Sequence, residues 1–90
     1  MPRRSHPVVT GQADLRRRLG VRVRELRTAK GLSQAELGHP SFDRQYVSAV
    51  ETGRITPSLP ATLHFARVLG ISMARLLQGV DPPPRGRRPS

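Results

Sequence analysis

The sequence contains no cysteine, and this absence removes several kinds of chemistry together. Without a thiol there is no disulfide, no thiolate nucleophile and no zinc site built from cysteine ligands. No run approaches the roughly 20 apolar residues that span a bilayer, and no apolar stretch follows the N-terminal arginines. We therefore expect neither a membrane segment nor a secretory signal, and a cytoplasmic location.

Clusters of metal-binding or catalytic residues are also missing. The three histidines, His6, His39 and His64, are scattered over an arm, a turn and a helix, and no two of them stand at His-x-x-x-His spacing. No glycine-rich loop joins a strand to a helix, and neighbouring Ser and Asp residues stand where helices are expected to begin. The sequence therefore predicts no metal, no cofactor, no catalytic residue and no enzymatic activity.

Acidic residues are scarce, whereas arginine is abundant. Sixteen Lys and Arg residues face six Asp and Glu residues, which gives a formal net charge of +10, and fifteen of the sixteen cations are Arg. The planar guanidinium suits phosphates and guanine edges. A polyanionic partner is the leading interpretation, and a merely soluble basic protein is the alternative.

The distribution of proline and of apolar residues predicts a single domain with two arms. Residues 1–11 and 80–90 combine prolines with arginines and lack an apolar period, so we expect a flexible basic arm and a flexible Pro/Arg-rich tail. In residues 12–79 the apolar positions recur at helical spacing, without the alternation of strands. This length suits one small core, and the fold class is all-α.

The first two helices have clear local signals. Over residues 13–30 the apolar side chains Leu15, Leu19, Val23 and Leu26 form one stripe. A second helix is expected to begin after Ser33, in an S-x-x-E capping box. Pro40 restricts the residue before it, so this second helix cannot continue past about residue 38.

Three more helices follow, each after a capping side chain. Asp43 can cap a helix over residues 44–51, while Ser58 and Ser72 can cap the last two. Only about four residues, 39–42, separate the second helix from the third. So short a connection turns the chain sharply, as in a helix-turn-helix.

Several motifs, in this order, resemble the phage-repressor-like helix-turn-helix family of the Cro or Xre type. They are LSQAEL at 32–37, YVSAVETG at 46–53, PSL at 57–59 and FARVLGIS at 65–72. The resemblance covers about residues 19–77. It implies a compact five-helix lambda-repressor-like domain, in which the third helix enters the major groove of DNA and the second crosses above the backbone.

The resemblance also implies which side chains face DNA, namely Gln34, Arg44, Gln45, Tyr46, Ser48 and Ala49. The arginine, the second glutamine and the alanine would meet base edges, since they suit guanine, adenine and the thymine methyl group respectively. Gln34 would meet a phosphate and brace the third helix. Ser48 and Tyr46 are candidate phosphate donors, although Tyr46 is equally a candidate for packing.

Two further features follow from the same resemblance. Arg27 and Glu51 are expected to form a structural ion pair between the first and third helices. The turn at residues 38–42 is shorter than the family usually has, with Phe42 in the apolar turn position. These residues do not determine the angle between the second and third helices.

Taken together, these features predict a sequence-specific DNA-binding transcriptional regulator, a repressor, that binds double-stranded DNA as a homodimer and is associated with the nucleoid. The dimer surface is expected at Met73 and Leu77, unless these residues complete the monomer core. One alternative function is an antitoxin that binds a toxin and represses its own operon. A second alternative is a basic architectural protein that coats DNA without sequence preference.

Overall fold

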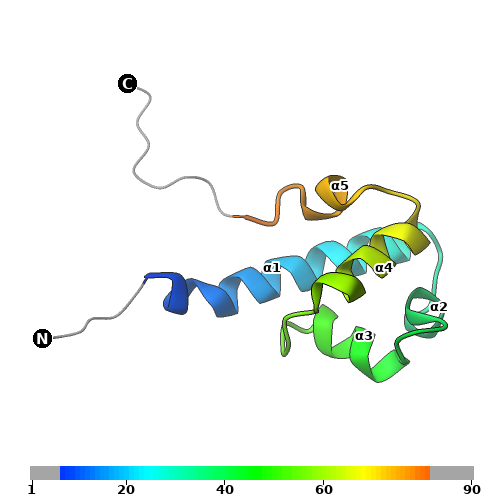
Figure 1. Ribbon diagram of the computed structural model, residues 1–90, viewed down its shortest axis with the longest axis horizontal. Coiled ribbons are helices and arrows are strands. Elements are labelled where there is room, and N and C mark those ends of the chain that lie inside the picture. The colour runs from blue at the N-terminus through cyan, green and yellow to red at the C-terminus, as the bar shows by residue number, and fades with distance from the viewer. Residues whose placement is uncertain (1–6, 82–90) are drawn as a thin grey trace, which may run out of the picture.

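The computed structural model describes the backbone of residues 7–81 and the side chains from residue 12 onward. Within this range the chain forms α-helices and no strand, which confirms the all-α prediction. The helices are α1 (Pro7–Ala29), α2 (Gln34–Gly38), α3 (Arg44–Glu51), α4 (Leu59–Leu69) and α5 (Met73–Leu77). Helix α1 runs along the molecule, with α2 and α3 on one side of it and α5 on the other (Figure 1).

The predicted caps are present in the structure. Ser33 Oγ accepts from the Glu36 amide at 3.0 Å, and Glu36 Oε1 accepts from the Ser33 amide at 2.7 Å, which completes the capping box. Asp43 caps α3 through the Tyr46 amide at 2.8 Å. The serines before α4 and α5 act in the same way. These local hydrogen bonds fix the beginnings of four of the helices.

One core joins all five helices. Its most buried large side chains are Val23 of α1, Leu37 of α2, Val47 and Val50 of α3, Phe65 of α4 and Leu76 of α5. The expected stripe of α1 is only partly buried, because Leu19 and Leu26 are half-buried and Leu15 is 44% exposed. No helix in the described part of the chain is long and apolar enough to cross a membrane.

Both ends of the folded region differ from the expectation. Helix α1 begins at Pro7, so residues 7–11 are helical and not part of a flexible arm. A proline suits a first helical turn, where its missing amide hydrogen has no partner to lose. At the other end Gly79 adopts φ +80° and Val80 is only 5% exposed, so residue 80 belongs to the core. The remaining parts of the expected arms, 1–6 and 82–90, lie outside the described residues.

Candidate nucleic-acid interface

The turn between α2 and α3 is compact and tightly packed. The Phe42 amide donates to the Gly38 carbonyl at 2.8 Å, and a Cβ on Gly38 would lie 3.1 Å from Val47 Cγ2. Phe42 is half-buried and its ring stacks on that of Tyr46, with the centroids 5.0 Å apart. Phe42 therefore occupies the apolar turn position, and the short connection is filled by side chains.

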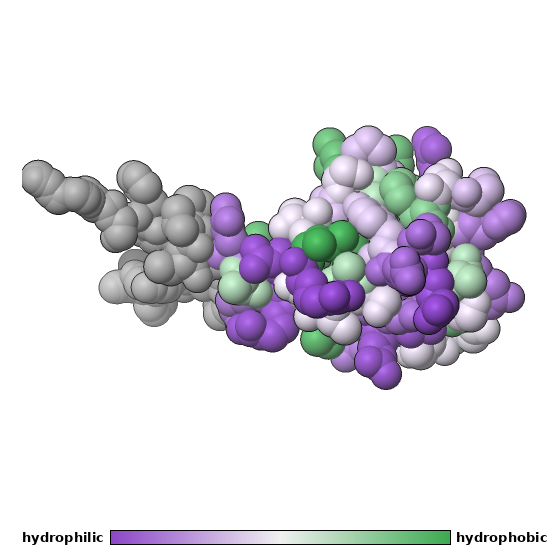
Figure 2. Space-filling model, turned by 90° about the horizontal axis from the view of Figure 1, so that it is seen from below, coloured by the Kyte–Doolittle hydropathy of each residue, from purple (hydrophilic) through white to green (hydrophobic). Residues whose placement is uncertain are grey.

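Helix α3 presents one polar edge to the outside. Val47 and Val50 are buried against the core, whereas Arg44 and Gln45 are exposed. Within the described residues, neither exposed side chain forms a hydrogen bond or an ion pair. Figure 2 views the molecule from the side on which α3 lies in Figure 1, and apolar side chains occupy only small patches of that face. The outer edge of α3 is thus free to meet another molecule.

The other predicted contact residues lie near this edge but are less exposed. Ser48 and Ala49 are half-buried on α3. Gln34 is half-buried at the start of α2, and its Nε2 donates to Glu51 Oε1 at 3.0 Å. The amide of Gln34 therefore braces α3, which is one of the two roles that the resemblance implies. Its contact with a phosphate stays a prediction.

Tyr46 is engaged inside the protein. Its ring packs on Phe42, and its hydroxyl oxygen accepts from the Ser58 amide at 3.2 Å. These contacts are those of the packing role considered for Tyr46. The role of Tyr46 as a phosphate donor is a prediction that no contact in the protein tests.

Glu51, at the end of α3, lies at the centre of a buried polar network. Arg27 Nε donates to Glu51 Oε2 at 2.6 Å and Nη2 donates to Oε1 at 3.0 Å, a two-pronged geometry typical of strong charged pairs. The exposed fractions of the two side chains are 12% and 2%. The hydrogen bond from Arg27 to Glu51, and then their charge attraction, raise the pKa of Arg27 above its ordinary value. Because Gln34 binds the same carboxylate, one buried charge holds α1, α2 and α3 together.

Two residues near α3 were missed by reasoning from the sequence. Gly20 of α1 is buried, and a Cβ there would lie 2.5 Å from the carbonyl oxygens of Val50 and Glu51. A lone glycine within a helical stretch is the signal that could have revealed this close crossing. Arg54 is exposed directly after α3, with its Nε donating to Thr52 Oγ1 at 3.2 Å. It places positive charge at the end of α3 opposite to Arg44.

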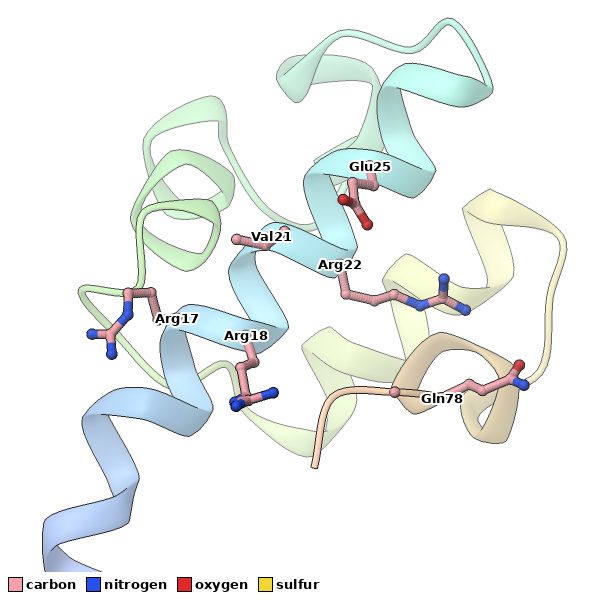
Figure 3. Close-up of a pocket in the computed structure, with 7 residues that line it drawn as sticks. Arg17, Arg18, Val21, Arg22, Glu25 and Gln78 are labelled. Carbon is pink, nitrogen blue, oxygen red and sulfur yellow. The ribbon is translucent and has the colours of Figure 1, made fainter. Parts of the chain in front are cut away.

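A basic hollow of about 500 Å³ lies along α1, between this helix and Gln78 at the end of α5 (Figure 3). In Figure 3, Arg22 reaches from α1 toward α5, where it donates to the carbonyls of Leu76 at 3.1 Å and Arg75 at 2.6 Å. Asp14 accepts from Arg17 at 3.0 Å and from Arg18 at 2.8 Å. The hydrogen bond from Arg18 lowers the pKa of Asp14 below its ordinary value. These arginines are thus already bound to groups of the protein itself.

The arrangement suits binding to the surface of another macromolecule better than it suits metal binding or catalysis. Within residues 12–81 no group of three His, Asp or Glu side chains is placed to hold a metal ion. What the site offers is a rigid helix with an exposed arginine and an exposed glutamine, braced from behind by a buried charge network. Such a helix can read the edges of base pairs in a major groove.

Comparison with known proteins agrees with this geometry. The family model described as a helix-turn-helix domain matches residues 18–78. The chain is 36% identical over 76 residues to the HTH-type transcriptional regulator y4dJ of Sinorhizobium fredii, covering 83% of this chain and 99% of the relative.

Two solved structures share the fold. One is the restriction-modification controller protein C.AhdI from Aeromonas hydrophila, with a TM-score of 0.68 and 48% identity over 73% of this chain and 96% of that one. The other is the hypothetical transcription factor NHTF from Neisseria, with a TM-score of 0.66 and 34% identity over 92% of this chain and 88% of that one. The chain belongs to the Cro/Xre-like helix-turn-helix family of DNA-binding transcriptional regulators.

Proposed function

We propose that this chain is a sequence-specific repressor that inserts α3 into the major groove and represses by covering a promoter. The observation that carries the proposal is the free outer edge of α3, where Arg44 and Gln45 are exposed while Val47 and Val50 hold the other edge in the core. Ala49 lies on the same helix for contact with a thymine methyl group. Gln34 and Ser48 serve as phosphate contacts. We place the protein in the cytoplasm, on chromosomal DNA.

The proposal includes a homodimer, since one recognition helix reads only about half an operator. Leu59 and Leu63 of α4 are 71% and 37% exposed, and Leu77 is 40% exposed, so apolar surface is available for a second copy. Met73, in contrast, is half-buried and packs against the core. Leu77 therefore stays in the proposed dimer surface, whereas Met73 contributes to the monomer.

Selecting bound sequences from a random duplex pool tests both parts of this proposal. We expect two half-sites in inverted repeat, with their centres about one helical turn, roughly 34 Å, apart. A single asymmetric site would contradict the dimer, and a pool with no enriched sequence would contradict specific recognition. Footprinting on the chain's own genome then tests repression, because protected sites should overlap promoters.

Arg44→Ala is expected to weaken binding to the selected operator by about 1–3 kcal/mol and to relax the preference at one base position. The physical reason is that an arginine fork can bind guanine O6 and N7 together, which alanine cannot. Binding is measured by fluorescence anisotropy on operators with each base at each position. Arg67→Ala on α4, which removes the same charge from an exposed position, is the control. An equal loss on every sequence would mean that Arg44 contacts a phosphate.

Arg54→Ala is expected to weaken binding to all sequences alike. Arg54 is exposed beside the end of α3, where a cation can neutralise a phosphate without touching a base. The slope of log K against log salt should therefore decrease in magnitude by about 0.9. Titrations at several salt concentrations on operator and random DNA measure the slope. An unchanged slope would show that Arg54 does not neutralise a phosphate.

A further inference from the structure

An aromatic cluster joins the short turn to α3 and α4. The ring centroid of Phe42 lies 5.0 Å from that of Tyr46, 5.4 Å from that of His64 and 6.1 Å from that of Phe65. Phe65 is fully buried, while the other three rings are half-buried. The cluster thus connects the core to the segment that sets the direction of the recognition helix.

The hydrophobic effect depends on buried area and is non-directional, so apolar contacts resist small changes in the direction of a helix less than a hydrogen bond does. A hydrogen bond adds a directional restraint. Within the cluster the hydroxyl of Tyr46 supplies one, since it accepts from the Ser58 amide at 3.2 Å. The other polar group there, His64 Nε2, is buried and has no hydrogen-bond partner among the described residues.

The partner of Tyr46 is itself firmly held. Ser58 is the N-cap of α4, and its Oγ accepts from the Ala61 amide at 3.1 Å. Tyr46 belongs to the first turn of α3, and its own backbone amide donates to the capping side chain of Asp43. The bond between Tyr46 and Ser58 therefore joins the first turn of the recognition helix to the beginning of α4, two segments that are each fixed by a cap.

We propose that Tyr46 is a positioning residue for base recognition, acting through the direction of α3 and not through a contact with DNA. This inference rests on the proposed function. If the bond to Ser58 is lost, α3 adopts its reading direction for only a fraction of the time, and the apparent affinity for the operator is multiplied by that fraction. Affinity for random DNA, which depends on phosphate contacts, does not require that direction.

Tyr46→Phe tests the proposal, because it keeps the ring and removes only the hydroxyl. We expect affinity for the selected operator to fall by up to about fivefold, the limit set by one lost neutral hydrogen bond, while affinity for random DNA is unchanged. Amide hydrogen exchange at Ser58, measured on the protein without DNA, should become faster. Binding is compared at a temperature where circular dichroism shows both proteins fully folded, so a simple loss of stability would not change the ratio.

Thr28→Ala is the matched control. Among the described residues its hydroxyl donates to carbonyls of its own helix, those of Arg24 and Glu25, so neither the operator preference nor Ser58 exchange should change. Equal weakening of Tyr46→Phe on operator and random DNA would overturn the proposal in favour of a phosphate contact. Unchanged operator binding would overturn it as well. A wild-type chain without any sequence preference would instead overturn the proposed function itself.

Discussion

Gly20→Ala is expected to lower the free energy of unfolding by about 2 kcal/mol. The new Cβ would lie 2.5 Å from the carbonyl oxygens of Val50 and Glu51, and both are backbone atoms that cannot rotate away. Overpacking of this kind costs about 1–3 kcal/mol or more, which exceeds the gain of about 1 kcal/mol that alanine brings to a helix. Urea unfolding followed by circular dichroism measures the difference.

Val21→Ala is the control for this substitution. Val21 is the next residue of α1 and is 50% exposed, so its replacement should change stability by no more than about 0.5 kcal/mol. If Gly20→Ala were as stable as this control, α1 could not cross α3 as closely as the structure shows. The same clash would push the end of α3 outward, so operator binding by Gly20→Ala should also decrease.

The helix beginnings were predictable because their signals are local. Each of Ser33, Asp43, Ser58 and Ser72 caps an amide three residues ahead, and such spacing can be found without knowing the rest of the fold. The short α2 was predictable for the same reason, since Pro40 excludes a longer helix. These local signals gave α3 its correct bounds and, with them, the exposed side of the recognition helix.

What the sequence did not reveal depends on how distant helices cross. The contact of Gly20 with the end of α3 joins residues about 30 positions apart, and no local signal measures that distance. The bond between Tyr46 and Ser58 likewise depends on the angle between α3 and α4. The three prolines that follow soon after Val80 predict that it belongs to the tail, yet the turn at Gly79 returns it to the core.

The net charge of the chain does not show how many of its arginines are free to contact DNA. The formal charge of +10 predicts a polyanionic partner, but several arginines are bound within the protein. Arg22 caps α5, Arg16 donates to the Gly53 carbonyl at 3.2 Å, and Arg27 is bound to Glu51. The number of phosphates neutralised on binding should therefore be smaller than the number of arginines. Arg44 and Arg54, at the two ends of α3, are the cations we expect to contribute most directly.

The largest loss of stability is expected from breaking the ion pair between α1 and α3. Arg27→Met would leave the carboxylate of Glu51, only 2% exposed, with Gln34 as its remaining partner. Removing one member of a buried pair costs about 3–5 kcal/mol, because the other charge stays buried without compensation. Glu51→Leu should cost less, since Arg27 is more exposed and keeps its bond to the Leu32 carbonyl.

The double variant Arg27→Met/Glu51→Leu separates the energy of the interaction between Arg27 and Glu51 from the contribution that each side chain makes by itself. Two apolar side chains of similar size need no charge partner, and only Gln34 and the Leu32 carbonyl lose a hydrogen-bond partner. The double variant should therefore lie within about 2 kcal/mol of the wild type and be more stable than Arg27→Met alone. Denaturant unfolding of all four proteins gives the coupling energy. If the losses of the two single variants simply added, each side chain would act independently. The ion pair at the end of α3 would then not stabilise the packing of the recognition helix on α1.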